Sequence, residues 1–216
     1  MQFRTPLLAR LQSSFQGYLD SLSKSGRHNF KVTMNANLGR EYIRVGFDKD
    51  LVSHWMAVWE RQEVNGHKPK WIFGPEYFEF QHRRDSLRLF AVTDGENFIG
   101  LHPTELHGNL IYSHPPCYDK SHPELARFMW FGLMKWGCEN GVEFVDLGGG
   151  NNGTWRDCAM SHVDGAFKYK WLYVPKESKD YPQEEPPYIE MRCECGNKQL
   201  VIGPEKCGYC HAQAVA

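Results

Sequence analysis

The sequence has little of several features that mark special classes of protein. No run of about 18 apolar residues occurs, so no membrane-spanning helix is expected. Charges of the two signs nearly cancel, with 25 Lys and Arg against 26 Asp and Glu, which excludes a nucleic-acid binder that is basic throughout. No internal repeat is visible. Of the 216 residues, 41% are hydrophobic, which is enough for a sizeable core, and we expect one globular domain with a possible appendage.

Secretory features are also sparse. The apolar stretch near the N-terminus, residues 6–9, is too short for a secretory signal. Without such a signal, seven cysteines argue against a disulfide scaffold and favour reduced thiols or metal ligation. We therefore expect a cytoplasmic protein with no membrane partner.

Helical periodicity occurs in two N-terminal segments. In residues 13–34, Phe15, Leu19 and Leu22 recur at helical spacing. The chain then turns basic over residues 24–44, which is either a solvated helix face or a phosphate-binding surface. Residues 48–63 predict a second helix with a tryptophan-bearing core face, capped by Asp48 or Asp50.

The middle of the chain predicts a hairpin and a buried helix. Residues 88–93 and 97–101 read as antiparallel strands joined by an Asp94-Gly95 turn. A helix is predicted to begin at Ser121, where Ser121 and Glu124 have the spacing of a capping box, and to end at Gly141. Its body is apolar nearly all round, as expected of a buried helix.

A strand over residues 142–147 leads into a glycine-rich loop, which lets a ligand approach the backbone closely. A last strand is expected over residues 166–174. Its two lysines, Lys168 and Lys170, alternate with aromatic residues, so both lysines face one side of the strand.

The C-terminal region predicts a metal module. Residues 175–187 are charged and proline-rich, as in a linker between a domain at 1–174 and a module at 188–216. The module has two close cysteine pairs: Cys193 with Cys195, and Cys207 with Cys210. Four thiolates on two tight turns suit tetrahedral Zn²⁺ and leave no open coordination position. The pattern indicates a zinc ribbon with structural Zn, whose binding would stabilise a module with little core of its own.

Three blocks together resemble the acyltransferase-like domain of the GNAT superfamily, in its FemAB/CelD-like branch. The first is the Tyr-Leu-Asp-Ser-Leu-Ser segment at 18–23, followed by Arg27. The second is residues 112–124, where Tyr118-Asp119 precedes the long apolar helix. The third is the strand ending Asp146-Leu-Gly-Gly, followed by the Phe-Lys-Tyr-Lys-Trp segment at 167–171.

The resemblance implies an α+β fold with a mixed, mostly antiparallel sheet flanked by helices. Members of this family move an acyl or aminoacyl group from acyl-CoA or aminoacyl-tRNA to an amine. The chain lacks the Arg/Gln-x-x-Gly-x-Gly/Ala pyrophosphate loop that is typical of acetyl-CoA users, which favours a bulkier or tRNA-borne donor. The alternative is a GNAT-like binding protein without catalysis, which recognises RNA or a protein through the zinc ribbon and the basic helix.

The resemblance also implies roles for individual residues. Asp146 would orient the acceptor amine or take its proton, or alternatively cap the glycine loop, and Asp119 and Tyr118 are further catalytic candidates. The backbone N–H groups of the loop could line an oxyanion or phosphate site. The residues expected to bind the donor are Gly148, Gly149, Gly150, Lys168, Lys170 and Arg27. Lys168 matches the family lysine better, although the pattern leaves Lys170 open.

Overall fold

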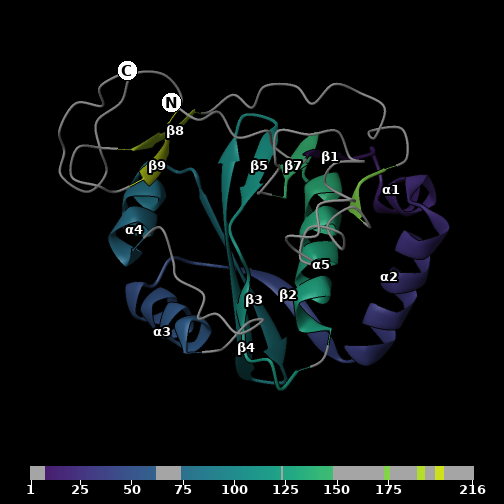
Figure 1. The fold of residues 1–216 in the computed structure, drawn as a ribbon, viewed down its shortest axis with the longest axis horizontal. Helices are drawn as coiled ribbons and strands as arrows, with labels where there is room; N and C mark the ends of the chain where they lie inside the picture. Colours follow the sequence, from purple (N-terminus) through teal and green to yellow (C-terminus); the bar gives the residue numbers. More distant parts are fainter. Residues whose placement is uncertain are drawn as a thin grey trace, which may run out of the picture. The chain divides into compact units, whose positions relative to one another are not determined.

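The computed structural model describes residues 8–61, 74–122, 124–147, 173–175, 189–192 and 198–201. These residues fall into two compact units that alternate along the chain. The first unit draws on Met1–Leu38, Gly108–His114 and Glu124–Pro186, and the second on Gly39–His107, Pro115–Pro123 and Pro187–Ala216. Each unit is described by itself below, and the elements carry the labels of Figure 1.

The sheet of the first unit consists of β1 (Leu8–Arg10), β5 (Leu110–Ser113) and β7 (Phe144–Asp146). β7 lies in the middle. It pairs antiparallel with β1, where Leu8 is opposite Asp146, and parallel with β5, where Tyr112 is opposite Asp146. The predicted strand over 142–147 is thereby confirmed over its central three residues.

Two helices, α1 (Phe15–Ser21) and α2 (Lys24–Ala36), replace the single N-terminal segment whose periodicity was helical. Each begins at a serine cap: the Ser14 hydroxyl accepts from the N–H of Gly17, and the Ser23 hydroxyl accepts from the N–H of Gly26, both at 3.1 Å. A serine cap satisfies an N–H group that lacks an intrahelical partner, so Ser23 starts a new helix.

The buried helix of the first unit, α5 (Leu125–Glu139), starts later than predicted and has no capping box. Glu124 is the N-cap residue with φ at 61°, and its side chain makes no capping bond. The carboxylate instead accepts from Arg127 at 2.7 Å and from the Thr33 hydroxyl at 3.2 Å. The capping-box prediction was therefore wrong, because tertiary partners bind the glutamate. Gly141, with φ at 70°, follows the helix end as expected.

The sheet of the second unit is antiparallel throughout its described strands, which are β2 (Arg40–Val45), β3 (Leu87–Asp94), β4 (Asn97–His107) and β6 (Cys117–Tyr118). The predicted hairpin is confirmed, but its turn is shifted by one residue. Asp94 pairs with Asn97, so the central residues are Gly95 and Glu96, and among them only Gly95 has positive φ. Glycine at the first central position is typical of a type II′ turn.

Two helices pack on this sheet: α3 (Lys49–Glu60) and α4 (Pro75–Arg83). Asp48, not Asp50, caps α3, because its carboxylate accepts from the N–H groups of Asp50 and Leu51 at 2.8 and 2.9 Å. Trp55 is buried in the core, as its spacing predicted. The core residues of this unit are Val52, Trp55, Met56, Tyr77, Phe78, Leu87, Leu89, Ala91, Leu101 and Cys117.

At the C-terminus, β8 (Ile189–Arg192) and β9 (Lys198–Val201) form an antiparallel pair. The four cysteines of the predicted zinc ribbon lie outside the described residues, as do the linker over 176–187 and residues 166–172 of the predicted last strand. Tyr173 and Val174 are described and belong to no strand. No helix in the described part of the chain is both long and apolar enough to span a membrane.

Candidate functional site

The parallel pair β5 and β7 gives the first unit a distinctive sheet edge. Because parallel strands run in the same direction, their carboxyl ends meet at one edge, and ligands of open α/β sheets bind outside such ends. β5 ends at Ser113 and β7 ends at Asp146. The predicted catalytic carboxylate thus lies at the edge where this rule places a ligand.

Asp146 is fully buried in the middle strand of this sheet. Its partner across the parallel ladder is Tyr112, and residues directly opposite each other point to the same face of a sheet. His114 follows two residues after Tyr112 and packs edge-on against its ring, with centroids 4.8 Å apart. Asp146, Tyr112 and His114 therefore share one face near the carboxyl ends, and all three are buried.

A buried carboxylate on the same sheet face as a tyrosine and a histidine can hold a cationic or amine group and accept its proton. Two residues after Asp146 the chain enters the glycine run Gly148, Gly149 and Gly150, which lies outside the described residues. The same is true of Lys168 and Lys170, so their roles as donor-binding residues stay predictions.

Tyr118 and Asp119 lie in the second unit, where β6 ends. The Tyr118 ring packs against Trp59 with centroids 5.5 Å apart, and burial raises the pKa of its hydroxyl above the ordinary value. Asp119 Oδ1 accepts from the backbone N–H of Ser121 at 2.8 Å, and this hydrogen bond lowers the pKa of the carboxyl. Asp119 thus organises its own turn, which is a structural contact in addition to the predicted catalytic role.

Arg27 lies in the first turn of α2. Its Nη1 donates to the backbone carbonyls of Asp20 and Leu22, at the C-terminal end of α1. A cation at the C-terminal end of a helix satisfies carbonyls that lack an intrahelical partner. The structure therefore gives Arg27 a local structural contact, and its predicted donor-binding role stays a prediction.

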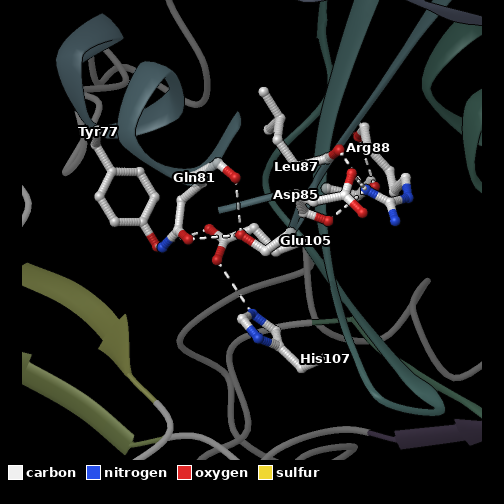
Figure 2. Close-up of polar contacts among 9 residues, drawn as sticks. Tyr77, Gln81, Asp85, Leu87, Arg88, Glu105 and His107 are labelled. Carbon is white, nitrogen blue, oxygen red and sulfur yellow. Dashed lines mark hydrogen bonds and ion pairs between the residues drawn. The ribbon is translucent and has the colours of Figure 1, made fainter. Parts of the chain in front are cut away.

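A second buried polar cluster, which sequence reasoning missed, lies in the second unit (Figure 2). The fully buried carboxylate of Glu105 accepts from the Tyr77 hydroxyl at 2.7 Å and lies 3.1 Å from Nε2 of His107. The Tyr77 oxygen in turn accepts from the Gln81 amide at 2.9 Å, and the Gln81 carbonyl accepts from Ser86 at 2.6 Å. The cluster joins α4 to β4 through polar groups.

The signal for this cluster was present in the sequence. Glu105 is opposite Leu87 in the β3–β4 ladder and shares the core face with Leu101, since residues four apart in a strand point the same way. A glutamate and a histidine two residues apart at inward positions of an apolar strand require buried partners. Which partners they find depends on α4, which the sequence analysis did not predict.

Comparison with known proteins adds the family. The model of the acetyltransferase (GNAT) domain matches residues 29–169 of the chain, which is more than half of its length.

The chain belongs to the GNAT acetyltransferase family.

The matched GNAT range contains Asp146, Tyr118, Asp119, the glycine run and Lys168. Arg27, Lys170 and the cysteine-rich C-terminus lie outside it. No curated protein matches the chain. Among the described residues, no group of three or more His, Cys, Asp or Glu is arranged to hold a metal ion.

Solved structures share this GNAT fold at low identity. The structure of FemX matches with a TM-score of 0.59 and 14% identity, over 80% of this chain and 59% of that one. L-PGS from Bacillus licheniformis matches with a TM-score of 0.50 and 14% identity, over 80% of this chain and 57% of that one. A conserved protein of unknown function from Bacteroides thetaiotaomicron VPI-5482 matches with a TM-score of 0.51 and 14% identity, over 82% and 58%. The chain therefore spans less than two thirds of the length of each of these proteins.

Proposed function

We propose that this protein transfers an acyl or aminoacyl group from a CoA or tRNA carrier to an acceptor amine. One observation carries the proposal: a fully buried carboxylate, Asp146, lies at the carboxyl end of the parallel pair β5 and β7, two residues before a triple glycine. The GNAT match over 29–169 supports an acyltransferase.

The chemistry needs no covalent enzyme intermediate. The amine nitrogen attacks the carbonyl carbon of the thioester or ester, and the carbon–sulfur or carbon–oxygen bond to the carrier then breaks. The nitrogen loses one proton, which Asp146 accepts directly or through water. The same proton then passes to the sulfur or oxygen of the departing carrier, which leaves as the thiol or alcohol, and Asp146 returns to the carboxylate. Backbone N–H groups of Gly148 to Gly150 would stabilise the oxyanion. Lys168 and Lys170 would neutralise phosphates of the carrier, and Tyr118 and Asp119 stay further candidates at the acceptor.

Two classes of carrier, acyl-CoA and aminoacyl-tRNA, are compatible with the proposed site. The GNAT domain favours an acyl-CoA donor. The missing pyrophosphate loop and the resemblance to the FemAB/CelD-like branch favour a bulkier or tRNA-borne donor.

Three variants test the proposed site. Asp146→Asn, Lys168→Ala and Lys170→Ala are assayed for transfer from acyl-CoA and from aminoacyl-tRNA to a panel of amines. Asp146→Asn keeps the shape of the side chain and removes the base, so we expect a loss of about 10²- to 10⁴-fold in kcat/KM. The control is Asp20→Asn, an exposed residue of α1, which should leave transfer unchanged. Full activity of both Asp146→Asn and Lys168→Ala would show that the site is wrongly assigned.

The second candidate function is a GNAT-like binding protein without catalysis. Two of the predicted site residues favour it, because Asp119 and Arg27 are engaged in local backbone contacts. Retention of RNA or a protein partner by the purified chain, with no transfer from either donor class, would favour this candidate over the enzyme.

We also propose that the C-terminal cysteines hold structural Zn²⁺. Support comes from the donor set: Cys193 and Cys195 fall in the connection between the paired strands β8 and β9, and Cys207 and Cys210 follow β9. Two cysteine pairs, one in the connection of a short hairpin and one after its second strand, provide the four thiolates of a tetrahedral S₄ site. The ion would crosslink the module and would take no part in the transfer.

A further inference from the structure

Helix α2 has two faces of opposite character. Gly26, Thr33 and Asn37 are buried, and the ring of Phe30 packs against Phe131 of α5 with centroids 5.1 Å apart. These four residues recur at positions i, i+4, i+7 and i+11, so they form one stripe along the helix. This stripe of α2 is therefore used for packing inside the first unit, whereas Val32 on the same helix is 41% exposed.

The opposite stripe of α2 is exposed and basic. Lys24, His28, Lys31 and Asn35 have the same i, i+4, i+7, i+11 spacing and are all exposed. At 100° per residue this stripe lies on the far side of the helix from the buried one. No residue of α2 is acidic, so the helix carries no anion of its own to neutralise Lys24 and Lys31. We call Lys24, Arg27, His28 and Lys31 the basic face.

The cations of the basic face differ from the other cations in the described part of the first unit. Those others are each in an ion pair: Arg10 with Glu143, Arg127 with Glu124, and Lys135 with Glu139. Among the described residues, Lys24, Arg27 and Lys31 form no ion pair. Arg27 binds two neutral carbonyls, which leaves its charge uncompensated. The unneutralised positive charge of the described first unit is thus concentrated on one side of one helix.

The spacing of these charges fits an extended polyanion. Lys24 and Lys31 lie seven residues apart, which is about 10 Å along the helix at 1.5 Å per residue. One nucleic-acid strand carries a charge about every 3.4 Å along its axis and can reach both lysines at once. A membrane surface fits less well, because amphipathic helices bind lipid through a broad apolar face. Phe30 packs inside the unit, and Val32 alone among the large apolar side chains of α2 is exposed.

We propose that the basic face of α2 binds the phosphodiester backbone of an RNA. The inference rests on the proposed function in one respect, because the RNA is the carrier of the transferred group. The contact is to phosphates and therefore independent of base sequence. The charges of Lys24, Arg27 and Lys31 form the contact, and Arg27 is fixed in place by the end of α1.

The test measures binding of bulk unacylated tRNA to the full-length chain by fluorescence anisotropy, over about 50 to 200 mM salt. We expect log K to fall linearly with log salt. In the double variant Lys24→Gln/Lys31→Gln, the magnitude of the slope of log K against log salt concentration should fall by about 1.5, because two phosphate contacts are lost. Binding at low salt should weaken about 10-fold. The matched control is Lys49→Gln/Lys135→Gln, which removes the same charge from lysines that are ion-paired.

Each outcome decides the inference. An unchanged salt dependence in the control supports it, whereas equal losses in both double variants would show a net-charge effect and overturn it. Tighter binding of polyglutamate, or of vesicles containing equal parts of phosphatidylglycerol and phosphatidylcholine, would assign the face to an acidic protein or a membrane instead. The two proposals fail separately. Transfer from acyl-CoA without tRNA binding would refute this inference and leave the proposed function standing. Binding of tRNA through α2 without transfer from any donor would refute the proposed function and leave this inference standing.

Discussion

Replacing Tyr77 by phenylalanine tests the buried polar cluster of the second unit. The Tyr77 hydroxyl is fully buried, donates to the Glu105 carboxylate at 2.7 Å and accepts from the Gln81 amide at 2.9 Å. Tyr77→Phe removes both hydrogen bonds and leaves the ring in place. The substitution should therefore lower the free energy of unfolding through the lost hydrogen bonds, with little change in packing.

The expected loss is worked out for an ionised Glu105 carboxylate as the acceptor. A hydrogen bond to a charged group contributes about 1.5–3 kcal/mol, and a buried amide N–H that loses its acceptor costs about 1–3 kcal/mol. Because interactions within one network are not additive, we expect a total loss of about 3 kcal/mol, a large share of a typical free energy of unfolding of 5–15 kcal/mol.

The matched comparison is Tyr18→Phe in the first unit. The Tyr18 hydroxyl is equally buried and donates at 2.7 Å, but to the neutral backbone carbonyl of Tyr173. That variant should lose only about 1–1.5 kcal/mol.

Urea unfolding followed by tryptophan fluorescence measures both losses. Trp55 lies in the same core as Tyr77, and Trp130 packs against Tyr173, the hydrogen-bond partner of Tyr18. A loss for Tyr77→Phe that is equal to or smaller than the loss for Tyr18→Phe would refute the reasoning. A double-mutant cycle with Glu105→Gln then isolates the coupling between the hydroxyl and the carboxylate, which we expect to be above about 1 kcal/mol.

Three further predictions concern other parts of the chain. Asp48→Ala should lower the free energy of unfolding by about 1 kcal/mol, because the carboxylate caps α3. Asp50→Ala should change it by less than about 0.5 kcal/mol. Equal effects of the two variants in urea titrations would contradict the assignment of the cap. Burial raises the pKa of Tyr18 and Tyr42 well above their ordinary value of 10.0, so the folded state holds these protons more tightly than the unfolded state. This contribution to stability is complete below about pH 10 and is lost as the pH rises further. Phenolate absorbance from these two tyrosines should therefore appear together with unfolding. Ionisation of the tyrosines without unfolding would contradict this prediction. Native mass spectrometry should show one Zn²⁺ per chain that Cys207→Ser or a chelator removes, and a metal-free chain as purified under reducing conditions would reject the ribbon.

Local patterns carried the prediction of α3 and of the β3–β4 hairpin. Apolar residues that include Trp55 recur at helical spacing after a capping aspartate. Gly95 marks a tight turn between two apolar runs. Each signal lies within a few residues of the element that it specifies. The turn was misplaced by one residue because Asp94-Gly95 and Gly95-Glu96 are both acceptable two-residue loops, and only strand pairing decides between them.

Where the prediction was wrong or silent, a distant contact decides the structure. The capping box at Ser121 and Glu124 failed because Glu124 binds Thr33, which is 91 residues away in sequence. The Glu105 cluster was missed because α4 was not predicted, although the Gly74-Pro75-Glu76 start is a typical helix N-terminus.

The candidate site was predicted only in part. Asp146 was chosen as the polar residue at the end of a strand, and the sheet places it beside a parallel neighbour that no local pattern indicates. The shared face of Asp146 with Tyr112 and His114 follows from that pairing and could not be predicted from the sequence alone. The same holds for the local partners of Arg27 and Asp119.

The alternation of the two units along the chain limits how the gene can be shortened. The chain passes from one unit to the other after Leu38, His107, His114, Pro123 and Pro186, so a stop codon at any of these points leaves at least one unit incomplete. Ending at His107, for example, would encode α1 and α2 without α5, the helix against which Phe30 packs. Fragment expression and deletion mapping should therefore yield unfolded products, and point variants of the intact chain are the suitable way to assign activity to either unit.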